Sequence, residues 1–216
     1  MSTPTDGGDR PIALFDFDGT LTVGDTLMPF LKYVAGAPRY YAKLALVSPV
    51  LGAYLAGCIR NDVAKQWVLK QYLAGYSMEA LWALGTGFSA SVVPAMLRPE
   101  GVERLRWHQA LGHRCILVSA SMDVYLDAWA KQAHFSELIC TTLERDTAGL
   151  VTGRIQGRNC HGDEKLRRWV AWQKGKREVP VYAYGDSSTD IALLRYAHHG
   201  FMWHPRTRRF VPVNAL

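Results

Sequence analysis

The sequence predicts an α/β protein: a Rossmann-like parallel sheet core with helices on both faces, and an inserted all-helical cap domain. Three observations predict this fold. Short apolar runs with the length of buried strands occur at residues 12–15, 115–118 and 179–184. Helical patterns alternate with these runs, which is typical of parallel sheets with right-handed crossovers. Residues 24–96 carry helical patterns alone, although a single crossover helix would need far fewer residues.

Length and composition fit a folded protein with one main core and a smaller accessory domain. The chain has 216 residues, of which 49% are hydrophobic and 20% are charged. Its four cysteines form no CxxC pair, which favours reduced, buried thiols in a cytoplasmic protein over disulfides or a zinc site. Residues 1–10 are polar and lack the apolar core of a signal peptide, so we expect a disordered lead-in there.

The net charge of +6 comes largely from basic residues late in the chain. These residues are scattered, no aromatic platform alternates with them, and no helix-turn-helix or zinc-finger spacing is present. We therefore expect no nucleic-acid partner. The positive charge instead favours a solvated face that attracts an anionic substrate.

Two carboxylates, Asp16 and Asp18, directly follow the first predicted strand, Ile12–Phe15. Alternate residues of an extended backbone point the same way, so these two side chains should share a face. Like charges this close repel, and a bound cation or a shared proton is the usual remedy. The alternative is a strand that simply ends in an Asp-Gly turn.

Helical patterns fill the region between the first strand and the second. The predicted helices cover residues 27–34, 62–72, 77–91 and 99–111. Asp25 and Thr26 precede the first of these helices and are suited to cap it. We therefore assign residues 1–23 and 97–216 to the sheet core and residues 24–96 to the cap domain.

The stretch Leu44–Ile59 contains no charged residue. It is too short to span a membrane, which takes about 20 residues, and Pro49 interrupts it. We interpret it as a buried helical hairpin. The alternative is an interfacial element that makes peripheral contact with a bilayer, flanked by the basic residues Arg39, Lys43 and Arg60.

The second half of the chain continues the alternation of strands and helices. After the strand at 115–118 we expect a helix at 123–133, a strand at 138–141, a hairpin at 143–155, a helix that Asp163 caps, a strand at 179–184, a helix at 191–197 and a strand near 201–203.

Three polar clusters follow strands of this predicted sheet, and Lys165 lies near the start of a helix. The clusters are Asp16 with Asp18, Ser119 with Ser121, and Asp186 with Asp190. Ligands of open parallel sheets collect outside the carboxyl ends of the strands. Carboxylates gathered there would need a divalent cation, and ligation by oxygen alone suits Mg²⁺. A serine hydroxyl, backbone amides and a lysine suit a phosphate.

These clusters, in this order, resemble the four motifs of the haloacid dehalogenase (HAD) superfamily of phosphohydrolases. The matching residues are Asp16-Phe17-Asp18-Gly19-Thr20, Ser119, Lys165, and Gly185-Asp186 followed by Asp190. The resemblance covers nearly the whole chain. The helical insertion between the first two motifs, and the glycine-containing run from Thr152 to Lys165, are similar to the phosphoserine-phosphatase-like branch.

The resemblance implies a phosphatase that works through an aspartyl-phosphate. Asp16 would be the nucleophile. Asp18 would protonate the leaving oxygen and then activate water. Mg²⁺ would be held by the carboxylates of Asp16 and Asp186 and by the backbone carbonyl of Asp18.

The remaining motif residues would hold the phosphoryl group. Ser119 and Lys165 would bind its oxygens, and the N–H of Ala120 would add a donor. Asp190 would hold Lys165 or the waters of the metal. Each residue has a structural alternative: Lys165 as a solvated surface lysine, and Ser119, Asp186 and Asp190 as helix caps.

The cap should select the substrate. In phosphoserine phosphatases a glutamate soon after the first motif binds the substrate amine, and Asp25 resembles it in position. Those enzymes also bind the substrate carboxylate through a cap arginine, whereas the helix at 62–72 has only Lys65 and Lys70, with an apolar face. We therefore expect a small or moderately apolar phosphomonoester. A lipid head-group phosphate of the phosphatidylglycerophosphate type is the first alternative, and phosphoserine is the second.

Two alternatives lie outside the phosphatases. A dehalogenase would use Asp16 but has no need of the acid–base group at Asp18. A non-catalytic phosphate-binding module would be expected to lack one of the motif residues, and none is missing.

Overall fold

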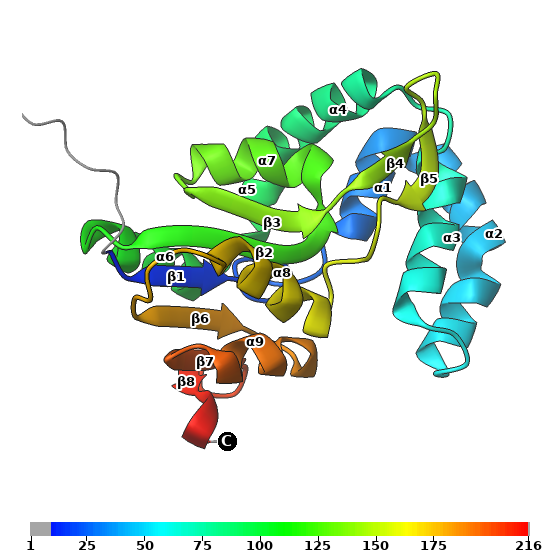
Figure 1. The fold of residues 1–216 in the computed structure, drawn as a ribbon. Coiled ribbons are helices and arrows are strands. Elements are labelled where there is room, and N and C mark those ends of the chain that lie inside the picture. Colours follow the sequence, from blue (N-terminus) through cyan, green and yellow to red (C-terminus); the bar gives the residue numbers. More distant parts are fainter. Residues whose placement is uncertain (1–9, 216) are drawn as a thin grey trace, which may run out of the picture.

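The computed structural model describes residues 10–215, and Figure 1 shows their arrangement. The lead-in expected at the N-terminus lies, apart from Arg10, outside these residues. The strands are β1 (Ile12–Phe15), β2 (Arg114–Met122), β3 (Glu137–Thr141), β4 (Leu143–Arg145), β5 (Val151–Ile155), β6 (Val181–Gly185), β7 (His199–His204) and β8 (Arg209–Pro212). The helices are α1 (Leu27–Ala35), α2 (Ala37–Leu55), α3 (Asn61–Leu73), α4 (Met78–Ser91), α5 (Val93–Met96), α6 (Pro99–Ala110), α7 (Asp123–Gln132), α8 (Asp163–Gln173) and α9 (Ile191–Tyr196), with 3₁₀ turns at Ser188–Asp190 and Val213–Ala215.

The main sheet of the described chain has the strand order β3-β2-β1-β6-β7-β8. All neighbouring pairs are parallel except β7–β8, where β8 runs antiparallel along the edge. β1 lies at the centre, and Phe15 at its end pairs with Leu117 of β2 and Tyr184 of β6. The carboxyl ends of these three strands therefore lie on the same side of the sheet, which is the edge where the acidic residues follow. The predicted α/β fold with a parallel sheet is confirmed.

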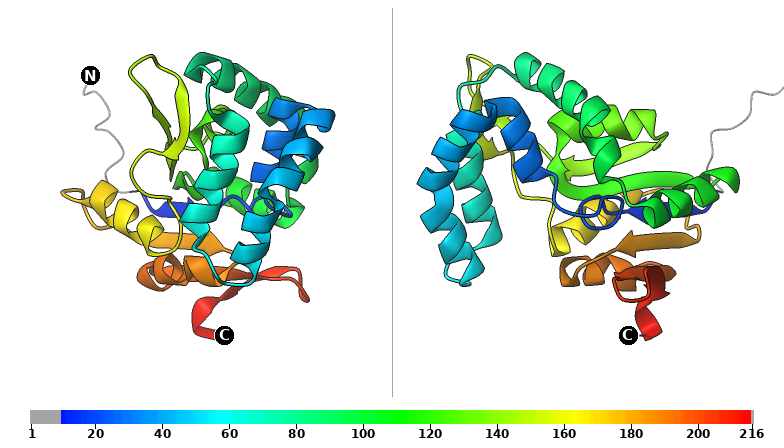
Figure 2. Two further views of the ribbon diagram at one scale, coloured as in Figure 1. Left: turned by 90° about the vertical axis from the view of Figure 1, so that its right-hand side faces the viewer. Right: turned by 180° about the vertical axis from the view of Figure 1, so that it is seen from behind.

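Alternate residues of β1 point into two separate apolar clusters, one on each face of the sheet. Ile12 and Leu14 pack with residues of α8 and α9, such as Trp169. Ala13 and Phe15 lie in the cluster that contains residues of α6 and α7. The two further views in Figure 2 show helices on both faces of the sheet. A strand that is buried on both faces explains why the first apolar run shows no polar alternation.

We define the cap as α1, α2, α3 and the hairpin β4–β5, which lies beside α3 in Figure 1. The hairpin joins the cap through two backbone hydrogen bonds of 2.9 Å, from Gly75 N to Val151 O and from Val151 N to Tyr76 O. Gly153 of β5 has φ +80°, and a Cβ there would lie 2.3 Å from the Cα of Lys70, so only glycine lets β5 approach α3 this closely.

Two segments pack across the predicted division of the chain, whose bounds stay a prediction. Residues 143–155 were assigned to the core, but the hairpin they form packs on α3. α4 was assigned to the cap, but it packs on α7, and a Cβ at Gly85 would lie 1.8 Å from Val124 O. The pairing of remote backbone segments, which carries no local sequence signal, causes the first difference.

The stretch Leu44–Ile59 is not a buried hairpin. Its first three-quarters belong to the single helix α2, in which Val47 is the buried residue while Leu46 and Leu55 are 59% and 82% exposed. α2 continues through Pro49, which cannot donate to the carbonyl of Ala45 four residues earlier. The hydroxyl of Ser48 donates to that carbonyl instead, at 2.8 Å. No described helix is both long and apolar enough to cross a bilayer.

Local predictions differ from the structure at a few further positions. Cys58 is exposed, whereas the other three cysteines are buried as expected, and all four are free thiols. Gly162 rather than Asp163 is the N-cap of α8, and no side chain caps that helix. The short elements α5 and β8 were not predicted, because four residues are too few to show a period.

Candidate active site

The acidic residues that follow β1 and β6 meet at the edge where these strands end. Asp16 is 6% exposed, and its backbone N–H donates to Tyr184 O at 3.0 Å. Carboxylate oxygens of Asp16, Asp186 and Asp190 all lie within 4.8 Å of one another. The sheet thus brings Asp16 close to Asp186 and Asp190, which lie far along the chain from it.

Lys165 reaches this cluster from the first turn of α8. Its Nζ lies 2.6 Å from Asp16 Oδ1 and 2.6 Å from Asp190 Oδ1, and the residue is only 2% exposed. Burial is the largest single effect and lowers the pKa of Lys165, but the carboxylates of Asp16 and Asp190 together outweigh it and raise the pKa. The alternative of a solvated surface lysine is therefore wrong.

Asp186 and Asp190, the two aspartates that follow β6, differ in the number of hydrogen bonds that they accept from the protein. Oδ2 of Asp190 accepts hydrogen bonds from the backbone N–H groups of Asp186 (3.3 Å) and Ser187 (3.2 Å), and from the Ser187 hydroxyl (3.1 Å). Its Oδ1 accepts from Lys165. Asp186 accepts from the Thr20 hydroxyl at the longer distance of 3.4 Å. Asp190 is therefore positioned to hold Lys165, while Asp16 and Asp186 are better suited to bind a cation.

The donor set fits a small divalent cation. Burial is the main cause that raises the pKa of both Asp16 and Asp186, and Asp190 raises both further. A cation between these carboxylates would relieve this cost of keeping them ionised. Gly19, at φ +78°, lets the loop after β1 lie directly against Asp186, since a Cβ there would be 2.0 Å from its Oδ2. Oxygen ligands in so small a space fit Mg²⁺.

Asp18 lies apart from these carboxylates and is bound by hydroxyl groups. Ser121 Oγ donates to its Oδ2. The backbone N–H and the hydroxyl of Thr26 donate to its Oδ1 at 2.9 and 2.7 Å. Burial, aided by the charge of Asp25, raises the pKa of Asp18 to about 6 against the lowering effect of these hydrogen bonds. A carboxyl with this pKa can both give and take a proton near neutral pH.

The strand-end residues of β2 lie next to Asp18. Ser119 is 1% exposed, and its Oγ accepts the N–H of Ser121 at 3.1 Å. The carbonyl of Ala120 accepts from Nζ of Lys65 at 2.5 Å. Asp25 is exposed, and its Oδ1 accepts the N–H of Leu27 at 2.9 Å in the first turn of α1. All of the residues proposed from the sequence therefore lie at one end of the sheet or at the base of the cap.

A cleft of about 770 Å³ opens between this edge and the cap. Asp18, Ala120 and Asp186 line it on the side of the sheet, and Asp25 also lines it. Its apolar lining residues are Val23, Leu27, Met28, Leu51, Ala64, Val68, Trp203 and Pro205. The cleft thus combines an acidic end with an apolar wall.

Sequence reasoning missed several residues that line or support this cleft. The guanidinium of Arg98 donates to Gly19 O at 2.9 and 3.2 Å and lies 4.1 Å from the centre of the Trp203 ring. The sequence indicates Thr26 only as a helix cap, although it lies close to Asp18 in the chain. Lys65 extends from α3 into the cleft, and burial lowers its pKa to about 8. No sequence pattern indicates this position.

The fold and the site together define a hydrolase of the HAD type. The chain matches the haloacid dehalogenase-like hydrolase family over residues 13–195 and belongs to this family. It is 33% identical to the protein CicA of Caulobacter vibrioides over 191 residues, which cover 88% of this chain and 85% of that protein. It is 25% identical to a histidinol-phosphatase of Neisseria meningitidis over 200 residues, or 86% of each chain.

Solved structures show the same fold. A protein of unknown function from Bordetella pertussis aligns with a TM-score of 0.75 and 26% identity over 88% of both chains. A probable phosphoserine phosphatase from Vibrio cholerae aligns with a TM-score of 0.66 and 16% identity, over 98% of this chain and 65% of that one. The predicted HAD membership is confirmed, and the relatives named as phosphatases support phosphatase activity. The phosphoserine-phosphatase-like branch stays a prediction, with which the shared fold is consistent.

Proposed function

We propose that this protein is a Mg²⁺-dependent phosphomonoester hydrolase that works through an aspartyl-phosphate on Asp16. The observation that carries the proposal is the buried carboxylate cluster, in which Lys165 Nζ lies 2.6 Å from both Asp16 and Asp190. Such a buried lysine, beside carboxylates that burial disfavours, fits a site for a metal ion and a phosphate.

The phosphoryl group is transferred in two steps, first from the substrate to Asp16 and then from Asp16 to water. An oxygen of Asp16 attacks phosphorus, the bond between phosphorus and the ester oxygen breaks, and Asp18 donates its proton to that leaving oxygen. Asp18 then takes a proton from water as the water attacks phosphorus, which releases phosphate and restores the carboxylate of Asp16. The pKa of about 6 at Asp18 suits both transfers.

The other residues stabilise the phosphoryl group. Mg²⁺, held by the carboxylates of Asp16 and Asp186 and the backbone carbonyl of Asp18, would screen the charge between nucleophile and phosphate when bound. Ser119, the N–H of Ala120 and Lys165 bind the phosphoryl oxygens, where negative charge must be stabilised. Asp190 keeps Lys165 in place.

The substrate is a small or moderately apolar phosphomonoester. The apolar wall of the cleft, from Leu27 and Met28 of α1 to Val68 of α3, supports an apolar leaving group. A carboxylate at the rim, Asp25, would bind an amine on that leaving group. We expect the enzyme to act in the cytoplasm, as its free cysteines suggest.

The test measures phosphate release from p-nitrophenyl phosphate by protein dialysed against a chelator, with and without added Mg²⁺. We expect release only with the metal, and a loss of at least about 10³-fold in Asp16→Asn, which keeps the shape of the side chain but lacks the nucleophilic charge. Full activity of this variant would refute the nucleophile assignment. Metal-independent activity would refute the proposed role of Asp186.

A lipid phosphate is the second candidate. The observation that favours it is the exposure of Tyr41, Leu46 and Leu55 on α2, beside a cleft with an apolar wall. Vesicles that contain phosphatidylglycerophosphate would be compared with the soluble substrates of a phosphomonoester panel, which includes phosphoserine. Preference for the vesicles, lost in the double variant Leu46→Glu, Leu55→Glu, would establish the lipid candidate over the soluble one.

A further inference from the structure

Lys65 connects the cap to the catalytic end of β2. It lies on α3, and its Nζ donates to Ala120 O at 2.5 Å and to Asn159 Oδ1 at 3.2 Å. The HAD motifs do not include Lys65, which lines the cleft and makes its hydrogen bonds to protein oxygens. It is a half-buried cation that ties a cap helix to the backbone of the sheet core.

The peptide group that Lys65 contacts also sets the positions of two serines. The carbonyl of Ala120 belongs to the same peptide as the N–H of Ser121, which donates to Ser119 Oγ at 3.1 Å. The hydroxyl of Ser121 in turn donates to Asp18. One peptide plane therefore links Lys65 to the serine proposed to bind phosphate and to the carboxyl proposed to transfer protons.

Asn159 fixes the position of Lys65. Its Oδ1 also accepts from the hydroxyl of Thr141 at 2.8 Å, and its Nδ2 donates to Asn61 Oδ1 at 3.0 Å. Asn159 is 9% exposed, so these hydrogen bonds are largely shielded from water. Lys65 is thus held from the core side by Asn159 and from the cap side by the helix that carries it.

We propose that Lys65 is a positioning residue, which acts through the Ala120–Ser121 peptide to orient Ser119 and Asp18. This inference rests on the proposed function for its catalytic consequence, but its structural part stands on the contacts alone. Without the ammonium group, the Ala120 carbonyl loses a charged donor and the peptide is free to rotate. Small displacements of aligned groups are costly in catalysis, by about 10²-fold for 1 Å.

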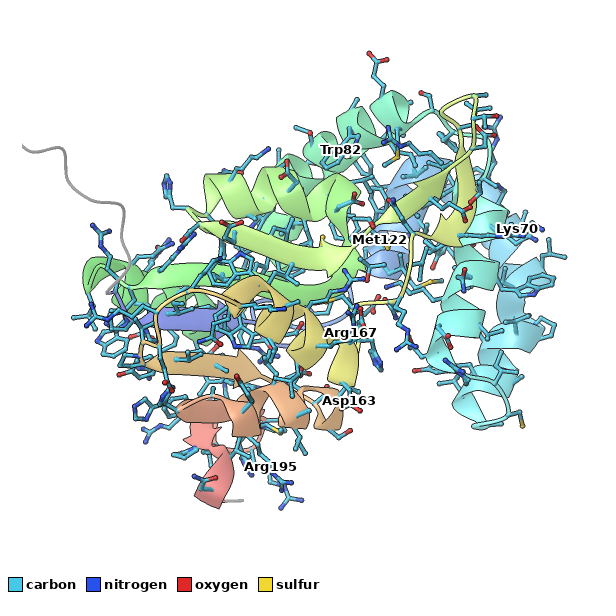
Figure 3. The ribbon with its side chains drawn as sticks, in the orientation of Figure 1. Lys70, Trp82, Met122, Asp163, Arg167 and Arg195 are labelled. Carbon is cyan, nitrogen blue, oxygen red and sulfur yellow. The ribbon has the colours of Figure 1, made fainter. Side chains whose placement is uncertain are left out.

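The experiment compares Lys65→Met with Lys70→Met on the same helix. Figure 3 shows Lys70 at the outer side of the cap, and its side chain is exposed. With p-nitrophenyl phosphate, we expect Lys65→Met to lower kcat by about 10- to 100-fold and to change KM by less than about threefold. Lys70→Met should match the wild type within about twofold.

A double variant tests whether Lys65 acts through the peptide. If it does, Lys65→Met combined with Ser121→Ala should lose no more activity than the more damaging single variant, because both break one chain of hydrogen bonds. Losses that multiply would overturn the proposal. A change confined to KM, or to substrates with an added anionic group, would also overturn it, since Lys65 would then bind the substrate.

Hydrogen–deuterium exchange gives a readout that does not depend on activity. We expect faster exchange in the segment that contains Ser119 and Ser121 in Lys65→Met, and unchanged exchange in Lys70→Met. Equal exchange in both variants would overturn the inference. If the wild type releases no phosphate, the proposed function fails, while this measurement still decides whether Lys65 orders the end of β2.

Discussion

The ammonium group of Lys165 lies 2.6 Å from Oδ1 of Asp16, and both side chains are almost wholly buried. Such a pair stays in place because each charge compensates the other, with Asp190 as the second acceptor on Lys165. The relationship means that one lysine is needed both for the stability of the cluster and for its proposed chemistry.

Replacement of Lys165 by Met should therefore affect both properties. Removing one partner of a buried pair leaves uncompensated charge, so we expect a loss of about 3 kcal/mol in the free energy of unfolding, with phosphatase activity reduced by at least about 10²-fold. Urea unfolding and phosphate release measure the two effects. Lys131→Met, which removes an exposed lysine paired with Asp127, is the control and should lose less than about 0.5 kcal/mol. Equal losses in both variants would contradict the structural account.

Replacement of Thr26 by Val should shift the pH dependence of catalysis. The hydroxyl of Thr26 donates to Asp18 and lowers a pKa that burial raises to about 6, so its removal should raise that pKa further. The step in which Asp18 acts as an acid needs the protonated form, so kcat/KM falls as pH rises through the pKa, and this fall should move to higher pH. A pH–rate profile of Thr26→Val beside Thr86→Val, an exposed threonine, measures the shift. An unmoved profile would exclude Asp18 as the acid.

Acid should destabilise the protein in part through His108. His108 is fully buried beside Tyr184 and His113, and burial, aided by the charges of His113 and Arg104, lowers its pKa from 6.5 to about 3. Between these values the unfolded chain binds the proton and the folded chain does not, so stability rises with pH over this window. At pH 5 the loss relative to pH 7 should be about 2 kcal/mol.

Thermal unfolding at several pH values checks this slope. His108→Gln should have a lower free energy of unfolding than the wild type at pH 7. Between pH 7 and pH 5, however, its free energy of unfolding should fall by less than that of the wild type. Parallel curves for the two proteins would show that another group causes the acid sensitivity.

Two glycines inside helices should respond in opposite ways to Ala. A Cβ at Gly85 of α4 would meet Val124 O of α7 at 1.8 Å, whereas a Cβ at Gly52 of α2 meets no atom within 4 Å. We expect Gly85→Ala to lower the free energy of unfolding by about 2 kcal/mol or more, and Gly52→Ala to raise it by about 0.5–1 kcal/mol. Denaturant titrations measure both. A neutral Gly85→Ala would mean that α4 and α7 separate at low cost.

The sheet and the acidic cluster could be predicted from the sequence because each depends on local patterns. A buried parallel strand is a short apolar run, and the residue that follows it must lie at the edge where ligands bind. Asp16, Ser119 and Asp186 each follow such a run. Asp190 belongs to the same polar cluster as Asp186, whereas the role of Lys165 depended on the order of the family's motifs.

The hydrogen-bond partners of Asp18 and the composition of the cap could not be predicted in this way. The contact between Lys65 and Ala120 joins a helix to a strand far along the chain. A single lysine has no periodic pattern from which such a contact could be predicted. The exposure of α2 was missed because a run without charges suggests burial, whereas the neighbouring helices cover only one narrow stripe around Val47.

The hairpin β4–β5 also determines the order in which this protein can mature on the ribosome. α3 emerges early from the ribosome. The hairpin strand β5 packs along α3 and begins beside the residue that pairs with the turn after α3, but it is synthesised only after β1, β2 and β3. The nascent cap therefore remains unfinished until half of the strands of the main sheet have been translated. A fragment that stops after α4 would lack the strand that pairs with the turn after α3.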